Sequence, residues 1–312
     1  MTEAIAPEAK QLFADFCIFA NGQLSSGDLD PTYPLLKEIY QAEGLDKERS
    51  LWRTLLYVTW YSLGSASRVW DLYPDPALPS PEKVQGLSTG TERRGFRGNL
   101  LSLAHLEKVL EASGGNLSSW LEGLTKAGGP EGWDSLREGF QKIPHAGPWS
   151  SYKLADLLAH VHDFPITASD LGVGGGSETA GPIPGMVRLT GQSWKECATN
   201  LSLQRALLED SRTAGVAFSG LDQLETALCD FNSLCKGHYY CGHDIDLQMT
   251  HLPARQAGIP FQSDVVETSP FWKARARVFP KEWLGEFNDW TGVRQGHKTI
   301  YRDEGRVFLC GQ

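Results

Sequence analysis

Apolar residues recur at intervals of three and four along most of the chain up to about residue 235, and this spacing constrains the fold most. Ala9, Leu12, Phe13 and Phe16 follow it near the start, and later segments repeat it between breaks rich in glycine and proline. Because this is the period of an amphipathic helix, the sequence predicts a mainly α-helical body. Helices are expected over residues 7–19, 35–41, 51–70, 100–112, 117–127, 133–140, 194–209 and 220–235. Gly64 and Ser65 are expected to mark a bend or an end within 51–70, and the four prolines of 73–86 predict a loop.

The remaining residues, 236–312, are mixed and aromatic in character. One strand pair is expected around 298–310, because Asp303, Glu304 and Gly305 can form its turn. We therefore expect three parts in the chain. They are an N-terminal helical segment over 1–44, a helical body over 45–250 that includes a hairpin at 141–161, and a mixed C-terminal extension over 251–312 that packs on the body.

Composition excludes several classes of protein. The net charge of −9 over 312 residues argues against a protein that coats nucleic acid through bulk charge, although a local basic groove is still compatible with it. No apolar run is long enough to span a membrane, and the first residues lack the basic and apolar regions of a signal peptide. The six irregularly spaced cysteines favour reduced thiols in a cytoplasm over a disulfide framework.

Residues 141–161 read QKIPHAGPWSSYKLADLLAHV, which predicts a tight turn followed by a helix with one apolar face. Gly147 suits a turn that needs a positive φ or a close backbone approach, and the free N–H groups at the helix start can grip a phosphate. An ordinary helical corner with a solvated polar face is the alternative. The expected polar face collects Tyr152, Lys153, Asp156 and His160, which are neighbours at spacings of three and four.

Four other segments were candidates for function. In TERRGFRGN, residues 91–99, the arginines beside glycines are suited to bind phosphate oxygens. A charged surface segment that is only solvated would have the same sequence pattern. In 271–283, basic residues interleaved with aromatics fit a nucleic-acid groove, with an amphipathic strand as the plain alternative. The loop 172–185 lacks the context of a nucleotide-binding motif, so no cofactor is expected. The segment 229–246 contains cysteines, histidines and acids, but its spacing differs from structural zinc sites, so no metal is expected.

The hairpin IPHAGPWSSYKLADLL resembles the helix-hairpin-helix element of DNA glycosylases, although His145 replaces their first turn glycine and Thr167 lies near the place of their catalytic aspartate. The chain is more similar to the phage family of alpha-glutamyl/putrescinyl thymine pyrophosphorylases, whose fold resembles that of the glycosylases. The similarity spans roughly 45–250. It is carried by Trp149, Tyr152, Asp156 and Leu157 in the hairpin helix, by AGPIPGMVRLTG, and by the Leu-Cys-Asp-Phe run at 228–231.

This resemblance implies a helix-hairpin-helix glycosylase-like body and, in the branch that fits best, an amino acid:DNA transferase. Such an enzyme attaches an amino acid, here expected to be glycine, through its amine to 5-pyrophosphoryloxymethyluracil in double-stranded DNA and releases pyrophosphate. A monomer in the cytoplasm of an infected host cell is expected, with free glycine as co-substrate and no cofactor. A DNA glycosylase and a non-catalytic DNA-binding protein are the alternatives.

The chemistry of this displacement suggests roles for individual residues. A general base must free the amine, and Asp156 is the first candidate, with a plain salt bridge to Lys153 as its alternative role. Asp170 is the second candidate. The expected catalytic residues are Asp156, Asp170 and Lys153; the expected DNA- or pyrophosphate-binding residues are Arg93, Arg94, Arg97, Lys142, His145, Gly147, Tyr152, Lys273, Arg275 and Arg277; and the expected amino-acid-binding residues are Lys236, His238, Tyr240, Asp244 and Asp246.

Overall fold

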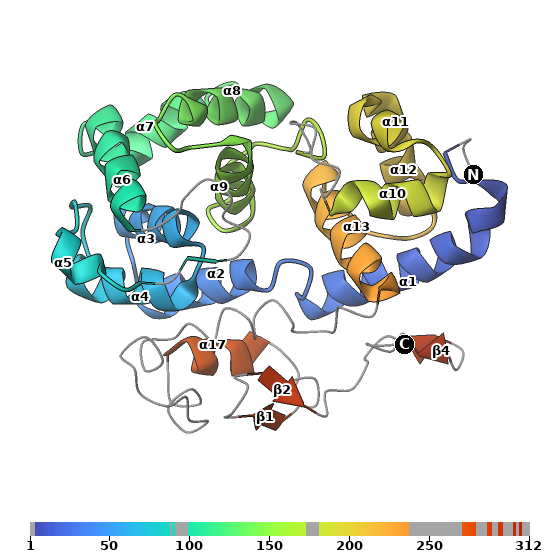
Figure 1. Ribbon diagram of the computed structural model, residues 1–312, viewed down its shortest axis with the longest axis horizontal. Coiled ribbons are helices and arrows are strands. Elements are labelled where there is room, and N and C mark those ends of the chain that lie inside the picture. Colours follow the sequence, from blue (N-terminus) through green and yellow to red (C-terminus); the bar gives the residue numbers. More distant parts are fainter. Residues whose placement is uncertain are drawn as a thin grey trace.

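The computed structural model describes residues 4–87, 89–90, 99–172, 181–236, 270–278, 286–288, 293–295, 302–303 and 306–307. Within these residues most of the regular structure is helical, which confirms the mainly α prediction (Figure 1). No helix in this part is long and apolar enough to cross a membrane. Two short antiparallel pairs are also present: β1 (Glu286–Asn288) with β2 (Val293–Gln295), and β3 (Arg302–Asp303) with β4 (Arg306–Val307). The second pair is the one expected around 298–310.

The helices fall into two groups that lie side by side (Figure 1). In the first group α3 is central, because it packs against α4, α6, α7 and α9. Trp52 and Trp60 of α3 are completely buried, which fits a helix surrounded on most sides. This group contains α2 (Thr32–Ala42), α3 (Lys47–Trp60), α4 (Leu63–Leu72), α5 (Pro81–Val84), α6 (Asn99–Ser113), α7 (Leu117–Leu124), α8 (Gly129–Gln141) and α9 (Pro148–His160).

The second group is built around the contact of α10 with α13, and the N-terminal η1 and α1 pack against it. Two glycines make this contact possible. A Cβ added at Gly181 would lie 2.1 Å from Cys229 Sγ, and one added at Gly185 would lie 2.3 Å from the carbonyl oxygen of Leu228. The group contains η1 (Pro7–Ala9), α1 (Lys10–Ser26), α10 (Pro182–Thr190), α11 (Trp194–Thr199), α12 (Leu201–Thr213) and α13 (Leu221–Cys235).

Two of the sequence motifs are therefore packing partners. The AGPIPG turn carries Gly181 and Gly185, and it lies against the Leu-Cys-Asp-Phe run of α13. Asp230 of that run accepts a hydrogen bond from buried Gln23 of α1 at 2.6 Å, which ties α1 to the same contact. These motifs thus hold the second group of helices together, and they place the N-terminal end of α13.

Some predicted boundaries are wrong for local reasons. The segment 51–70 forms two helices, but the break lies at Tyr61 and Ser62, a few residues before the expected Gly64 and Ser65, because Tyr61 adopts a left-handed conformation and Ser62 caps α4. The segment 194–209 is also divided, because Asn200 accepts the backbone N–H of Leu203 and starts α12. The loop expected over 73–86 contains the four-residue helix α5.

The first part of the segment 271–283, with its alternating charged residues, is not a strand. Residues 270–278 form a helix, α17 (Pro270–Val278), which packs against α2. Ala274 is fully buried there, and Arg277 forms an ion pair with Glu38 at 3.1 Å. A helix buries the small Ala274 and leaves Lys273 and Arg277 exposed, so an amphipathic helix also fits this pattern of charges.

Candidate active site

The polar side chains of α9 lie where the two groups of helices meet. Gly147 is the N-cap of α9 and Pro148 occupies its first turn, a position that tolerates a residue without an N–H. From there to Leu158 most of the helix is buried, including Lys153 and Asp156. Lys153, Asp156 and His160 are close together, as the spacing of three and four predicts.

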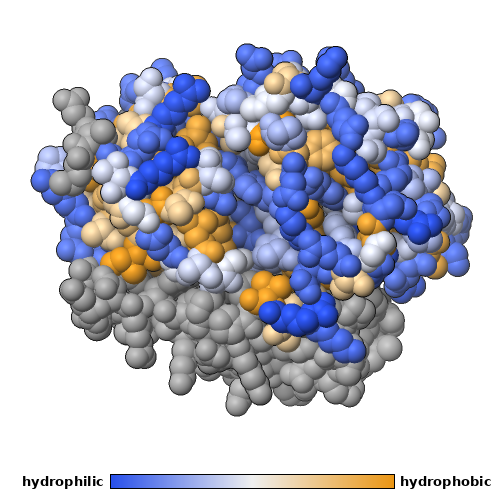
Figure 2. Space-filling view, turned by 180° about the vertical axis from the view of Figure 1, so that it is seen from behind, coloured by the Kyte–Doolittle hydropathy of each residue, from blue (hydrophilic) through white to orange (hydrophobic). Residues whose placement is uncertain are grey.

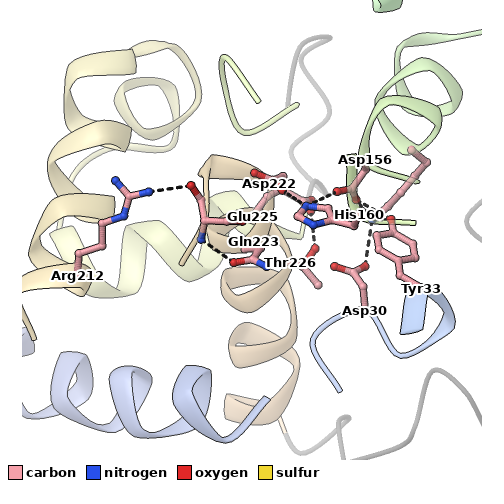
Figure 3. Close-up of polar contacts among 11 residues, drawn as sticks. Asp30, Tyr33, Asp156, His160, Arg212, Asp222, Gln223, Glu225 and Thr226 are labelled. Atoms are coloured by element: carbon pink, nitrogen blue, oxygen red, sulfur yellow. Dashed lines mark hydrogen bonds and ion pairs between the residues drawn. The ribbon is translucent and has the colours of Figure 1, made fainter. Parts of the chain in front are cut away.

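Asp156 is the centre of this cluster, with 1% of its surface exposed. The Tyr33 hydroxyl donates to its Oδ2 at 2.6 Å, and the Lys153 ammonium lies 3.3 Å from the same oxygen (Figure 3). Burial and the charge of Asp156 raise the pKa of Tyr33 well above its usual value, so the hydroxyl keeps its proton. A buried carboxylate is thus held by one donor and one cation from different helices.

His160 links Asp156 to the second group of helices. Its Nε2 is hydrogen-bonded to Asp222 Oδ2 at the start of α13 and lies 3.6 Å from Asp156 Oδ1 (Figure 3). Burial opposes the positive charge, but the hydrogen bond to Asp222 and the charges of Asp156, Asp222 and Asp30 outweigh it and raise the pKa of His160 to about 9. At neutral pH an imidazolium therefore lies between two buried carboxylates.

Lys153 and Asp30 form the other side of the cluster. Burial opposes the charge of Lys153, but Tyr33, Asp30 and Asp156 outweigh it and hold the pKa of the ammonium well above its usual value. Lys153 lies 3.5 Å from Asp30 Oδ1 in the turn between α1 and α2. Burial raises the pKa of the Asp30 carboxyl, and Lys153 partly offsets that rise. The site thus combines two cations with several acids, and protons can be shared among them.

Backbone features fix the position of Asp222. It lies in the first turn of α13, where the helix dipole favours a negative charge. The preceding cap residue is Gly220, and a Cβ added there would be 2.3 Å from Asp222 Oδ1. Glycine at this position therefore leaves the space that the carboxylate occupies beside His160.

The same three side chains are candidate metal ligands among the described residues. The ligand atoms of Asp156, His160 and Asp222 all lie within 4.8 Å of one another. In this arrangement the imidazolium supplies the positive charge between the carboxylates, so a cation is not needed to hold them together.

Asp170 and Tyr152 both contact Arg137 of α8. Asp170 pairs with Arg137 of α8 at 3.3 Å and accepts the backbone N–H of Gly172. Arg137 also lies over the Tyr152 ring, 5.4 Å from its centroid. The Tyr152 ring packs against Trp133. Burial raises the pKa of its hydroxyl well above the usual value, and Glu225, Asp156 and Asp222 add to the rise, so Tyr152 also lies near the cluster.

The turn between α8 and α9 differs from the expectation for Gly147. Gly147 has a φ of −83°, and an added Cβ would meet nothing within 4 Å. The residue with positive φ is His145, at 69°, where the glycosylase hairpins have a glycine. Lys142 and His145 are both exposed at this corner, beside the N-terminus of α9.

The other candidates lie on other elements or outside the described residues. Lys236 is exposed just beyond the C-terminal end of α13, about 20 Å of helix rise from Asp222. Lys273 and Arg277 are exposed on α17 beside α2, and only the backbone of Arg275 is described. Arg93, Arg94, Arg97, His238, Tyr240, Asp244 and Asp246 lie outside the described residues.

Sequence reasoning missed the partners that α9 finds in other helices. Asp30, Tyr33 and Asp222 were not among the candidates. Tyr33 is 123 residues from Asp156, and Asp222 is 62 residues from His160. An acid in the first turn of a helix after a glycine was visible at 220–222, but this is a common capping pattern and points to no partner.

Comparison with known proteins gives a family for about half of the chain. Residues 90–240 match the family model described as amino acid:DNA transferase. The match includes α9 and the start of α13, so it contains Lys153, Asp156, His160 and Asp222. No curated protein matches the chain. The resemblance to this family is confirmed, and it implies transfer of an amino acid onto modified bases of DNA.

Proposed function

We propose that this chain, which belongs to the amino acid:DNA transferase family through residues 90–240, attaches glycine by its amine to 5-pyrophosphoryloxymethyluracil in DNA and releases pyrophosphate. The family match supports the class of enzyme, and the chemistry of the α9 cluster supports the reaction. The glycine, the pyrophosphorylated base and a monomeric enzyme are parts of the proposal.

The observation that carries the proposal is the buried carboxylate of Asp156 between Tyr33, Lys153 and His160. An amino acid in solution carries an ammonium group, which has no lone pair and cannot attack carbon. A carboxylate that is held at the reacting group and shielded from water can accept this proton as a general base. Tyr33 and His160 keep their own protons and hold the Asp156 carboxylate in place, so Asp156 itself takes up the proton.

The proposed step is a displacement at the methylene carbon attached to C5 of the pyrimidine. The freed amine forms a new C–N bond, and the bond between that carbon and the pyrophosphate oxygen breaks. Pyrophosphate leaves with the bonding electron pair, and the proton lost by the ammonium is taken up by Asp156. The step is redox-neutral, because a carbon–nitrogen bond replaces a carbon–oxygen bond. The pyrimidine ring can help to expel the leaving group.

The cations of the cluster suit the departing pyrophosphate. Lys153 and His160 flank Asp156 on one face of α9, and the pKa values of both are raised by neighbouring acids, so both are positively charged at neutral pH. Fixed positive charges near a leaving group lower the energy of the transition state. Asp222 lies on the outer side of His160, where its carboxylate can also attract the ammonium group of the amino acid.

The corner before α9 is the proposed contact with the DNA backbone. Trp149 and Ser150 have backbone N–H groups in the first turn of α9, where no carbonyl of the helix can accept them. Lys142 and His145 are exposed beside this turn. Free N–H groups at the start of a helix commonly bind phosphate, which supports the hairpin as a contact with the DNA backbone.

Mass spectrometry of DNA nucleosides tests the proposal. DNA carrying 5-pyrophosphoryloxymethyluracil is incubated with the enzyme and isotopically labelled glycine, then digested. We expect an N-linked glycine adduct, loss of the adduct in Asp156→Asn, and retention in Asp170→Asn, because Asp170 is engaged with Arg137. Circular dichroism and DNA binding check that both variants fold.

Other results would change the assignment. An adduct with another amine, but none with glycine, would keep the reaction and replace the co-substrate. An adduct that persists in Asp156→Asn would move the base elsewhere. Abasic sites in place of an adduct would identify a glycosylase and overturn the proposal.

A further inference from the structure

The polar face of α9 continues into an aromatic residue at the hairpin. Trp149, Lys153, Asp156 and His160 follow one another at spacings of four, three and four, so they lie along one stripe of the helix. Trp149 is the residue of this stripe closest to the proposed DNA contact, and it is half-buried. The stripe therefore leads from the hairpin to the buried carboxylate.

Trp149 is paired with Tyr61 from the end of α3. The two ring centroids are 4.7 Å apart and the rings are nearly perpendicular, at 87°. Tyr61 is also half-buried, and it is among the groups whose proximity acts on the pKa values of Lys153 and Tyr33. The aromatic pair is thus next to the reactive cluster and keeps part of its surface accessible.

The backbone of Tyr61 is held in a conformation that a tyrosine rarely adopts. It ends α3 in the left-handed region, with φ 47°. The same capping position is filled by Gly27 after α1 and Gly191 after α10, with φ 73° and 67°. Glycine adopts this conformation without steric cost, and tyrosine does not. Strain of this kind gathers at functional sites, where the side chain is needed in that place.

Gly90 keeps Tyr61 in this position. Its backbone N–H donates to the carbonyl oxygen of Trp60 at 2.9 Å. A Cβ added at Gly90 would lie 2.2 Å from the carbonyl oxygen of Tyr61. The chain therefore passes in close contact with the end of α3, and only glycine fits there.

We propose that Trp149, held by the perpendicular ring of Tyr61, forms the platform on which the pyrimidine base of the target nucleotide stacks. This inference rests on the proposed function, because it assigns the place of the base in that reaction. Asp156 is 1% exposed, so a base inside a duplex cannot bring its C5 methylene to it. The nucleotide must leave the stack, and an aromatic side chain at the entrance replaces the stacking that it loses.

The test compares two labelled DNA duplexes that differ in one position, in the absence of amino acid. One carries an unpaired thymidine, and the other is fully paired. Fluorescence anisotropy should show that the wild type binds the first duplex about tenfold more tightly, since stacking on an aromatic side chain has roughly this effect. The ratio of the two affinities removes the contribution of general phosphate binding.

Three variants make the comparison specific. Trp149→Ala should lose the preference for the unpaired thymidine, and Trp149→Phe should keep most of it, because phenylalanine also offers a ring. Trp120→Ala is the control, since Trp120 is equally half-buried but packs on Phe140 in the body of the first group. Thermal unfolding shows whether each variant is folded.

The platform and the proposed function can fail separately. A preference that is absent in the wild type or unchanged in Trp149→Ala would overturn the platform, and so would transfer by Trp149→Ala with an unaltered KM for DNA. Loss of the preference in Trp149→Ala would support the platform even if no glycine adduct were found, and in that case the reaction alone would be wrong.

Discussion

Replacing His160 by glutamine should remove a pH-dependent part of the stability. The imidazolium of His160 lies between Asp222 and Asp156, and its pKa is raised from 6.5 to about 9. A raised pKa in the folded state means that the folded protein holds the proton more tightly than the unfolded chain. The stabilisation is therefore complete below pH 6.5, falls as the pH rises, and is lost above about pH 9.

The size of the effect follows from the pKa shift. A shift of one unit corresponds to about 1.4 kcal/mol, so the change from 6.5 to about 9 gives roughly 3 kcal/mol. This is an upper value, because 26% of the His160 side chain is exposed and water weakens the interaction. We expect the unfolding free energy of the wild type to exceed that of His160→Gln below pH 6.5. This difference should shrink by roughly 2–3 kcal/mol as the pH rises from 6.5 to about 9.

Urea unfolding at a series of pH values from 6 to 10 measures this difference. Asp30, Tyr33, Lys153 and Asp222 face the same cluster, and they are present in both proteins, so the subtraction reduces their contribution. NMR of the histidine ring protons gives the pKa of His160 directly, with His160→Gln identifying the signal. A difference that is constant with pH, or a His160 midpoint near 6.5, would refute the placement of an imidazolium between the two carboxylates.

Three further substitutions follow from single contacts. Tyr33→Phe should lower the unfolding free energy by about 1–3 kcal/mol in urea titrations, because Asp156 loses its donor at 2.6 Å; Tyr40→Phe, which loses only the contact with Thr54, should cost less. Gly220→Ala should displace Asp222 and lower the His160 pKa measured by NMR, whereas Gly147→Ala, whose added Cβ meets nothing within 4 Å, should not change it. His145→Gly should relieve a positive φ, so its melting temperature should not fall, while its affinity for duplex DNA measured by anisotropy should decrease if the hairpin binds phosphate.

Local periodicity predicted much of the helical structure and the inner part of the site. The spacing of Lys153, Asp156 and His160 placed them together, because residues three and four apart share a helix face. Tyr152 was assigned to the same face, and Asp156 and Asp222 do help to raise the pKa of its buried hydroxyl, but its ring packs against Trp133 and next to Arg137. A tyrosine at the edge of a polar stripe can turn to either side, and only the packing of α8 decides which.

The partners contributed by other helices could not be predicted from spacing. Tyr33 and Asp222 reach α9 through the way in which the two groups of helices meet, and no short pattern records that arrangement. Gly147 shows a related limit. A glycine and a proline predicted a turn correctly, but the sequence did not reveal that His145 takes the left-handed position.

The two groups of helices meet over a face with a hollow between them and hydrophilic residues along it (Figure 2). The turn from α1 to α2 crosses from one group to the other and carries Asp30 and Tyr33. This turn precedes the segment 90–240 that matches the family model. A shortened protein limited to that segment would keep Asp156 but leave its buried carboxylate without the Tyr33 hydroxyl. A shortened or fused version of this enzyme must therefore include the turn between α1 and α2 as well as residues 90–240.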